Sequence, residues 1–519
     1  MKVVSSGEMQ RLDQLTIQEY GIPALLLMEN AGQKTFSRLN SLFGSLKDKS
    51  ILIFAGAGNN GGDGLVLGRH LLQTGSNPAV YLVSGDLSLK KEAKVNYDIF
   101  KKIGGRIFDG KGSPSALDSL IQNSDILVDA IFGTGLNRPM EVKILETIQK
   151  INASGKKVVA LDIPSGVSAD TGALWGGAVK ADLTSTYGLP KKGHFLFPGA
   201  SFRGKLYVEE IGIPSTLIEK ESFKTEILER PFIQKIFPRK RPQDSHKGIF
   251  GHLLVIAGSR GKRGAGALCC KAALRSGAGL VTWALPERLD IPDSFIPEAM
   301  TLPLPETAEG TLSLAAEKPL LSFAKNKNAV AIGPGLSTHP ETRELIKRLL
   351  PQITCPIILD ADGITLLTEE KGLLKKIRVP VLMTPHPGEF GKFLGLDARA
   401  VQKERVALLS ETASQYGCTI LLKGAYSLIA DPNHSVWINP TGNPGMATAG
   451  TGDVLTGMIA GFCAQGIPFP EAAQIGVYLH GLSGDLALEE KGEISLMASD
   501  MIEKIPLAVQ HLTTGKNPL

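Results

Sequence analysis

The sequence predicts an α/β protein of two domains, each built on a parallel β-sheet covered by helices. Three observations lead to this prediction. The chain has 519 residues, which is too long for a single hydrophobic core. Its 43% apolar and 21% charged residues describe an ordinary globular protein. Both halves repeat a short β-rich apolar run, a glycine-rich or polar turn and a helical pattern, an alternation typical of parallel sheets.

The strands are expected in the following order. In the first half they are residues 50–57, 79–84, 125–132, 157–163 and 183–187, and in the second half 252–257, 329–333, 356–360, 379–384 and 419–423. Between the halves, residues 211–214 close the first pattern and a charged segment, 219–244, follows. The boundary is therefore expected at roughly 220–240, with domains of residues 1–220 and 221–519. The halves share no motif, which indicates a fusion and not a duplication.

Composition and charge exclude several classes of protein. A formal net charge of +5 with scattered Lys and Arg residues argues against nucleic acid as a partner. No stretch of about 18 apolar residues could span a bilayer, and the first residues lack the apolar core of a signal peptide. The five cysteines form an odd total without metal-type spacing. We therefore expect a soluble, cytoplasmic protein with buried thiols in a reducing compartment.

Three strand ends in the first half carry unusual residues. The first strand runs into Gly56-Ala-Gly-Asn-Asn-Gly-Gly-Asp-Gly64, where glycines permit a close approach of the backbone to a ligand. Two other strands end in Asp129 and Asp162, and buried carboxylates are costly unless they meet ligands or cations. Asn60, Asp129 and Ser165 would together suit a hard, weakly held cation, which leaves Asp162 as the best acid or base. A dinucleotide redox site is less suitable, because the second strand ends without an acidic residue to hold a ribose.

The second half contains the most informative run, Asn443-Pro-Gly-Met-Ala-Thr-Ala-Gly-Thr-Gly-Asp-Val-Leu-Thr-Gly457. Small residues before a helix, expected at 454–464, let backbone N–H groups converge on an anion, and the helix N-terminus adds partial positive charge. A carboxylate at Asp453 would repel that anion, so it needs another purpose. It could take a proton from a hydroxyl that attacks a terminal phosphoryl group. The alternative is that Asp453 only caps the helix.

Other strand ends in this half point to the same edge of the sheet, where ligands of open parallel sheets collect. They are the loop Gly258–Gly266, the turn Gly333-Pro-Gly335, the segment Thr384–Glu389 with His386 between two prolines, and Lys423–Ser427. His386 could be structural or contact a ligand. Asp360 and Asp362 could hold magnesium, bind substrate hydroxyls or form a turn. Two separate active sites are the natural expectation.

Gly-Asn-Asn-Gly-Gly-Asp-Gly (residues 58–64), together with Asp-Ile-Pro-Ser-Gly (162–166), resembles the NAD(P)H-hydrate epimerase domain over roughly residues 1–215. The resemblance implies a Rossmann-like three-layer parallel sheet that interconverts the R and S forms of hydrated NADH or NADPH and carries K⁺. It implies that Asp162 acts near the epimerising carbon. Lys192, in Pro190-Lys-Lys-Gly-His194, is expected to be a solvated loop charge, with a catalytic group as the alternative. The implied potassium ligands are Asn60, Asp129 and Ser165, and the implied contacts to the hydrate are Asn59, Asn60, Gly61, Gly62, Asp63, Gly133, Thr134, Gly135, Leu136, Asn137, Arg138, Pro139 and Asp162.

Three further motifs lie in the second half: Thr-Pro-His-Pro-Gly-Glu (384–389), Lys-Ala-Ala-Leu-Arg-Ser-Gly-Ala-Gly (271–279) and Ala-Thr-Ala-Gly-Thr-Gly-Asp (447–453). They resemble the ribokinase-like fold, and within it the ADP- or ATP-dependent NAD(P)H-hydrate dehydratase, over about residues 240–510. That family phosphorylates the hydroxyl of the hydrated ring, and phosphate then leaves. The resemblance implies Mg²⁺ with ADP (or ATP), with ADP favoured. The implied contacts are Ala265, Gly335, His386 and Asp453 to the hydrate, and Lys423, Gly424, Ala425, Tyr426, Ser427 and Gly452 to the nucleotide.

The chain departs from the second family at Gly264-Ala-Gly266, where Gly-Ala-Ala is usual, and a looser substrate loop is expected. The sequence thus predicts a bifunctional repair enzyme, expected as a homo-oligomer, in which epimerisation feeds a stereospecific dehydration. One alternative is a ribokinase-like kinase of a vitamin precursor or sugar alcohol. Another is that the N-terminal domain is a nucleotide-sensing or protein-binding module without catalysis.

Overall fold

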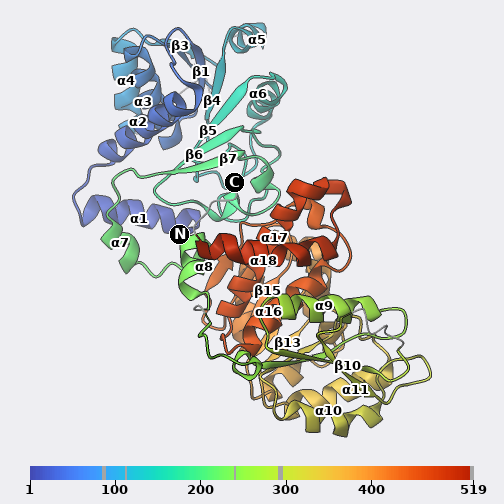
Figure 1. Cartoon of the computed structure of the whole chain (residues 1–519). Coiled ribbons are helices and arrows are strands. Elements are labelled where there is room, and N and C mark those ends of the chain that lie inside the picture. The colour runs from blue at the N-terminus through green and yellow to red at the C-terminus, as the bar shows by residue number, and fades with distance from the viewer. Residues whose placement is uncertain (84–88, 90, 111–113, 239–240, 290–295, 515–519) are drawn as a thin grey trace. The chain divides into compact units, whose positions relative to one another are not determined.

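The computed structural model describes residues 1–83, 89, 91–110, 114–238, 241–289 and 296–514. The chain divides into two compact units, one of residues 2–223 and the other of residues 224–519 with Met1. We call them the N-terminal and the C-terminal unit (Figure 1). One predicted strand, 79–84, ends in Ser84, which lies outside the described residues.

The N-terminal unit contains a seven-stranded sheet in the order β3-β2-β1-β4-β5-β6-β7. All neighbouring strands are parallel. The strands are β1 (Ser50–Ala55), β2 (Asn77–Leu82), β3 (Arg106–Asp109), β4 (Ile126–Ala130), β5 (Lys157–Leu161), β6 (Leu183–Tyr187) and β7 (Lys205–Glu209). The helices are α1 (Ser6–Gln18), α2 (Ala24–Phe43), α3 (Asn59–Gln73), α4 (Lys91–Lys102), α5 (Pro114–Gln122), α6 (Val142–Ala153) and α7 (Ser215–Lys220).

Both faces of this sheet are buried, which is why its strands read as continuous apolar runs. On β1, Ile51 and Ile53 pack into one core with Leu27 of α2 and Leu65 of α3. The alternate residues of β1 share a second core with α5 and α6. Figure 1 shows the corresponding layers, with α2, α3 and α4 on one side of the strands and α5 and α6 on the other. The three-layer architecture predicted from the sequence is confirmed.

The C-terminal unit contains a ten-stranded sheet in the order β11-β10-β9-β12-β13-β14-β15-β16-β17-β8. Strands β9 to β15 run parallel, whereas β15, β16 and β17 are antiparallel neighbours. Helices α8, α9, α16, α17 and α18 share one large core with the sheet. This is the α/β fold that the sequence predicts as ribokinase-like.

The strands of this unit are β8 (Thr225–Ile227), β9 (His252–Ile256), β10 (Leu280–Pro286), β11 (Met300–Leu304), β12 (Ala329–Ile332), β13 (Ile357–Leu359), β14 (Val381–Met383), β15 (Thr419–Leu422), β16 (Leu428–Ala430) and β17 (Val436–Ile438). The helices are α8 (Arg230–Ile236), α9 (Arg263–Arg275), α10 (Glu317–Ala324), α11 (Pro340–Leu349), α12 (Asp362–Thr365), α13 (Pro387–Leu394), α14 (Ala398–Lys403), α15 (Arg405–Tyr416), α16 (Thr451–Ala464), α17 (Glu471–Ser495) and α18 (Ala498–Thr514). No helix among the described residues is long and apolar enough to cross a bilayer.

Ten predicted strands are present, most of them shortened at their carboxyl ends. The prediction omits seven others: β3, β7, β8, β10, β11, β16 and β17. Strands β3, β7, β11 and β8 lie at the edges of their sheets, and β16 and β17 have only three residues each. Strands β3, β7 and β8 carry charged residues and β11 contains Pro303, so these edge strands lack the apolar run by which central strands are recognised. Strand β10 is central and buried. It has an apolar run, but the prediction does not include it.

Candidate functional sites

The first candidate site lies at the carboxyl ends of β1, β4 and β5. The strand order reverses between β1 and β4, so the loops after these strands leave a crevice of the kind in which such sheets bind ligands. The two loops touch: a Cβ atom on Gly56 would lie 2.0 Å from the carbonyl oxygen of Ile131, so only glycine fits there. The predicted residues Asn60 to Asp63 form the first turn of α3 directly above this contact.

Asp162, just after β5, is held by a lysine that the sequence analysis did not select. Lys191 Nζ donates to Asp162 Oδ1 at 2.5 Å, and Thr186 Oγ1 donates to the same oxygen at 3.1 Å. Lys191 is 1% exposed and also donates to the carbonyl oxygen of Tyr187. Burial would raise the pKa of Asp162, but the charge and hydrogen bond of Lys191 outweigh it and hold the pKa below its ordinary value. The Asp162 carboxyl group is therefore ionised at neutral pH.

His194 fixes the position of this pair as a neutral imidazole. Its Nδ1 accepts from the backbone N–H of Lys191 at 3.0 Å, so its Nε2 carries the proton and donates to the carbonyl oxygen of Asp162, also at 3.0 Å. Burial, reinforced by the charge of Lys191, lowers the pKa of His194 to about 3. Asp162 itself has a φ of +62°, a backbone conformation that costs energy in a residue other than glycine. The signal for this network lies in the segment 190–194, but at Lys191 and not at Lys192, whose Nζ lies 3.5 Å from Glu8 Oε2.

Two other carboxyl groups interact electrostatically with Asp162 and Lys191. Burial raises the pKa of Asp63 well above its ordinary value, and the charges of Asp162 and Asp13 add to this. Burial likewise raises the pKa of Asp13, on α1, to about 6. The site thus combines a carboxyl group whose pKa is lowered, Asp162, with one whose pKa is raised, Asp63. Divergent pKa values of this kind are typical of sites that contain a base and an acid.

The three predicted cation ligands are all buried. Asp129 Oδ1 accepts from Ser165 Oγ at 2.6 Å, and Asp129 Oδ2 accepts from the backbone N–H of Ser165 at 2.7 Å. Burial raises the pKa of Asp129 to about 6, against the lowering effect of these hydrogen bonds. Among the described residues, Asn60 Oδ1 and Nδ2 are buried and have no hydrogen-bond partner. An unpaired buried amide needs a partner that the protein does not supply.

The remaining predicted contacts to the hydrate lie around this centre. A Cβ atom on Gly133 would lie 3.1 Å from Asp162 Oδ2 and 3.5 Å from Asn60, so the structure brings these three residues together. Asn59 lies exposed at the N-terminus of α3. Residues 134–139 form the loop after β4, in which Gly135, Asn137, Arg138 and Pro139 are exposed. The structure describes no polar contact between this exposed part and Asp162.

The second candidate site is organised by Asp360, which is buried at the end of β13. Its Oδ1 accepts from Lys423 Nζ and from Thr384 Oγ1, both at 2.8 Å, and its Oδ2 accepts from Thr456 Oγ1 at 2.8 Å. Burial would lower the pKa of Lys423, but Asp360 and Glu389 outweigh this and raise it. The charge of Lys423, predicted for the nucleotide, is therefore shared with Asp360. Asp362 has another role, since its Oδ2 accepts from the backbone N–H of Ser337 and lies 3.3 Å from Lys262 Nζ.

Asp453 does not cap its helix. The N-cap of α16 is Gly450, with a φ of +90°, and Asp453 occupies the third helical position. The capping alternative is therefore wrong, because the helix begins three residues earlier than the sequence indicated. Among the described residues, the Asp453 carboxylate forms no hydrogen bond, yet it lies in the field of Asp360, Lys423 and Glu389. Burial and the neighbouring carboxylates raise its pKa to about 7, and Lys423 partly opposes them.

His386 proves to be both structural and accessible. Its Nδ1 accepts from the backbone N–H groups of Gly388 and Glu389, which makes it the N-cap of α13. The Glu389 side chain closes the capping box by accepting from the backbone N–H of His386 at 2.9 Å. The side chain of His386 is 57% exposed, with its Nε2 3.4 Å from Glu389 Oε1. The ring can therefore meet a ligand while it holds the helix.

The predicted loop of Ala265 and the turn of Gly335 lie against each other. Gly335 has a φ of +61°, and a Cβ atom there would lie 3.1 Å from that of Ala265. Ser259 Oγ donates to the carbonyl oxygen of Gly335 at 2.8 Å. The predicted nucleotide segment is likewise close to α16, since a Cβ atom on Gly452 would lie 3.3 Å from Lys423 Nζ. The structure thus groups Ala265 with Gly335, and Lys423 with Gly452 and Asp453.

Side-chain packing explains why position 266 is glycine and not the alanine that is usual in the dehydratase family. A Cβ atom there would lie 2.5 Å from Trp283 Cε2 and Cζ2 and 2.6 Å from Nε1, so alanine does not fit beside this tryptophan. Trp283 is buried and donates its Nε1–H to the carbonyl oxygen of Ala257 at 2.8 Å, so its ring is not free to turn. Glycine at 266 therefore packs the substrate loop tightly against the indole, and the expectation of a looser loop is not supported.

We expect Gly266→Ala to lower the melting temperature of the C-terminal unit. The overlap with Trp283 costs about 1–3 kcal/mol, which exceeds the gain of about 0.5–1 kcal/mol from replacing a helical glycine. Thermal unfolding of the full chain measures the change. Gly264→Ala is the matched control, because a Cβ atom at 264 would meet nothing within 4 Å. A Gly266→Ala variant as stable as the Gly264→Ala variant would contradict this explanation, whereas a smaller cost in a Trp283→Phe background would support it.

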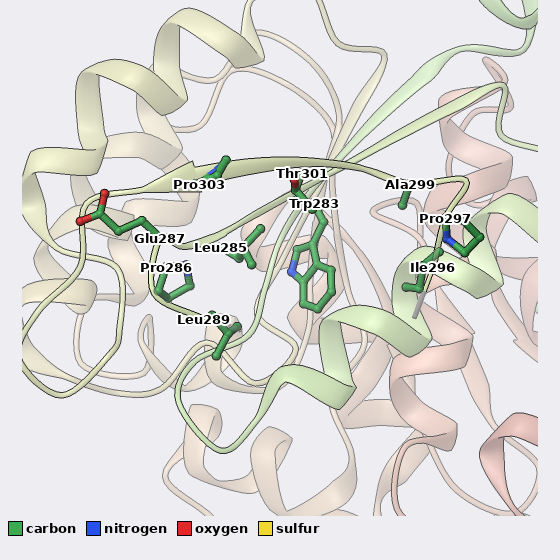
Figure 2. Close-up of a pocket in the computed structure, with 10 residues that line it drawn as sticks. All are labelled: Trp283, Leu285, Pro286, Glu287, Leu289, Ile296, Pro297, Ala299, Thr301 and Pro303. Carbon is green, nitrogen blue, oxygen red and sulfur yellow. The ribbon is translucent and has the colours of Figure 1, made fainter. Parts of the chain in front are cut away.

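Trp283 also lines a pocket that sequence reasoning missed. The pocket has a volume of about 390 Å³ and lies along β10 and β11. Figure 2 shows the indole of Trp283 with Leu285, Leu289 and Ile296 around the same space. Its size is within the range of small-molecule sites, and its lining combines apolar side chains with the polar side chains of Glu287 and Thr301. The pocket was missed because neither of its strands was predicted.

Both units of the chain are similar to known proteins. Residues 24–193 match the family described as YjeF-related protein N-terminus, and residues 253–507 match the family described as NAD(P)H-hydrate dehydratase. The bifunctional NAD(P)H-hydrate repair enzyme Nnr of Moorella thermoacetica is 42% identical over 99% of this chain and 97% of the relative. The enzyme of the same name from Thermofilum pendens is 39% identical over the same shares. This chain belongs to the family of bifunctional NAD(P)H-hydrate repair enzymes.

The predicted function is thereby confirmed at the level of the family. The chain is an enzyme with an epimerase half and a dehydratase half. Among solved structures, the ADP/ATP-dependent NAD(P)H-hydrate dehydratase from Bacillus subtilis, co-crystallised with ATP and Mg²⁺, is 31% identical. It covers 55% of this chain and 98% of its own, with a TM-score of 0.49. The described residues contain no group of three or more His, Cys, Asp or Glu side chains suited to a metal ion.

Proposed function

We propose that Asp162 and Asp63 carry out the epimerisation of hydrated NADH and NADPH in the N-terminal unit. Inverting the carbon that bears the hydroxyl requires a bond to that carbon to break and form again, with protons moved by a base and an acid. Lys191 holds the pKa of Asp162 below its ordinary value, which suits a base, and burial raises the pKa of Asp63, which suits an acid. The proximity of Gly133 to Asp162 Oδ2 supports a place for the hydrated ring between the two loops.

We propose that K⁺ is held by Asn60, Asp129 and Ser165. The unpaired amide oxygen of Asn60, the buried carboxylate of Asp129 and the hydroxyl of Ser165 form an oxygen donor set of low charge, which fits a monovalent cation. The ion would supply positive charge next to the substrate. Because both oxygens of Asp129 already accept hydrogen bonds from Ser165, the structure supports a site that orders the loop after β4 before substrate binds.

In the C-terminal unit, we propose that Asp453 takes the proton from the ring hydroxyl as that hydroxyl attacks the terminal phosphoryl group of a nucleotide. Phosphate is a better leaving group than hydroxide, so its departure restores NAD(P)H. The amides at the start of α16 would hold the phosphoryl oxygens. Mg²⁺ would enter with the nucleotide and neutralise phosphate charge, as it commonly does in sites where substrate phosphates supply part of its ligands. The observation that carries this assignment is the Asp453 carboxylate, which is unpaired, partly buried and raised in pKa to about 7.

We also propose that ADP is the favoured phosphoryl donor, with ATP as the alternative. His386, Ala265 and Gly335 would contact the hydrate, and residues 423–427 with Gly452 would contact the nucleotide. All five cysteines are buried and unpaired, which supports a reducing compartment and hence the cytoplasm. A homo-oligomer is proposed, with no nucleic-acid or membrane partner.

Recovery of NADH absorbance from a mixture of R and S NADH hydrate tests the proposal. With Mg²⁺, K⁺ and either ADP or ATP, we expect complete recovery, and faster recovery with ADP. Recovery that stops at the S fraction would refute the epimerase assignment. No recovery, together with a stable phosphorylated product from another alcohol, would favour the ribokinase-like kinase.

A further inference from the structure

Arg405 is a buried arginine without a carboxylate partner. It is the first residue of α15, is 3% exposed, and forms no ion pair among the described residues. Its Nη1 donates to the carbonyl oxygen of Ala425 at 3.2 Å, whereas its Nε and Nη2 are buried and have no hydrogen-bond partner. Taking an unpaired guanidinium out of water costs several kcal/mol, so an arginine kept in this position indicates a compensating partner.

The guanidinium lies directly beneath the loop of residues 423–427. A Cβ atom on Gly424 would lie 3.3 Å from Arg405 Nη2, and Gly424 has a φ of +143°. Tyr426 in the same loop has a φ of +51°, an unusual conformation outside glycine that tends to occur at ligand sites. Ser427 Oγ donates to the carbonyl oxygen of Gly424 at 2.9 Å. The carbonyl oxygens of Gly424 and Ala425 therefore both accept hydrogen bonds from side chains, those of Ser427 and Arg405.

The amides of this loop remain available for a ligand. Among the described residues, the backbone N–H groups of Gly424 and Ala425 donate no hydrogen bond, whereas that of Lys423 donates to Pro385. Lys423 cannot supply the missing positive charge by itself, because Asp360 accepts from its Nζ at 2.8 Å. Burial lowers the pKa of Arg405 to about 10, so the guanidinium stays charged at neutral pH. Arg405 is thus a buried cation without a carboxylate partner, and it lies next to the backbone amides of Gly424 and Ala425, which have no hydrogen-bond acceptor among the described residues.

We propose that Arg405 is a positioning residue for the phosphate groups of the nucleotide: it holds the loop 423–427 through Ala425 and supplies the positive charge that this anion neutralises. The inference rests on the proposed function in one respect, that the loop binds the nucleotide. Unpaired amides and a buried cation are the elements by which proteins bind phosphate. The arginine acts from below the loop and takes no part in the chemical step.

Arg405→Gln and Arg405→Lys test the proposal in the full-length enzyme. We expect Arg405→Gln to raise KM for ADP or ATP roughly 10-fold or more, the effect typical of a lost charge-assisted hydrogen bond, and to leave KM for the hydrate unchanged. Arg405→Lys keeps the charge but loses the fork geometry, so an intermediate KM is expected. Arg343→Gln is the matched control, because Arg343 also has a buried Nε without a hydrogen-bond partner, but its guanidinium pairs with Glu369 and forms no described hydrogen bond with the loop.

Ligand-induced thermal shifts with adenosine, AMP and ADP provide a readout that does not depend on activity. We expect Arg405→Gln to reduce the shift caused by AMP and ADP and to leave that of adenosine unchanged. Equal shifts and equal KM for nucleotide in the wild type and both variants would overturn the proposal and leave Arg405 a structural residue. If Arg405→Gln does not fold, the nucleotide KM of Arg405→Lys decides. A wild type that binds ADP without dehydrating the hydrate would refute the proposed function but not this inference.

Discussion

Asp453→Asn is expected to abolish dehydration and leave epimerisation intact. The substitution keeps the size of the side chain and its place in the first turn of α16, but it removes the only function that a base requires, the capacity to accept a proton. General bases contribute roughly 10²- to 10⁴-fold to a rate, and we expect a loss of kcat in this range. The measurement is NADH recovery from purified S hydrate, with epimer exchange followed separately on the R hydrate.

The pH dependence of dehydration provides a second test of Asp453 as the base. A base works in its ionised form, so kcat/KM for dehydration should be constant above pH of about 7 and fall tenfold per pH unit below it, following the raised pKa of Asp453. Asp397→Asn removes an exposed carboxylate from the N-cap of α14 and should behave as the wild type. A normal rate in Asp453→Asn, or a wild-type profile without an acidic limb, would contradict the assignment of the base.

Asp162→Asn is expected to abolish epimerisation by a similar factor and to leave dehydration of the S hydrate unchanged. With mixed epimers, NADH recovery should then stop at the S fraction. Asp170→Asn, an exposed carboxylate of the same unit that accepts from Ser6, is the matched control. Full activity in Asp162→Asn would support the alternative in which the N-terminal unit is a non-catalytic binding module.

The same substitution should also destabilise the N-terminal unit, because it leaves the charge of Lys191 buried without its partner. Breaking such a pair costs about 3–5 kcal/mol. The double variant Asp162→Asn with Lys191→Met removes both charges, and we expect it to recover most of the lost thermal stability while it remains inactive as an epimerase. Recovery of stability together with activity would show that Asp162 acts only through folding.

Much of the fold could be predicted from the sequence because local patterns determine it. Central strands such as β1 and β9 are buried on both faces and must be apolar throughout, and glycine-rich turns follow them wherever the backbone has to approach another loop or a ligand. Edge strands such as β3 and β7 obey no such requirement and were missed. The turns at residues 56–64 and 447–453 indicated the two sites for the same reason. The residue types in these turns lower the stability of the fold unless a ligand is bound.

The contacts of the site residues were decided by the tertiary structure. Lys191 is adjacent to Lys192 in the sequence, and only the packing of residues 190–194 under β5 determines which of the two meets Asp162. Gly266 is explained by Trp283, and Arg405 by the loop after β15, in each case across a strand connection that no local pattern records. The sequence by itself determined which residue types stand at the strand ends. Folding decided which of them are paired, buried or left with an unsatisfied charge, because burial and charge act through space and not along the chain.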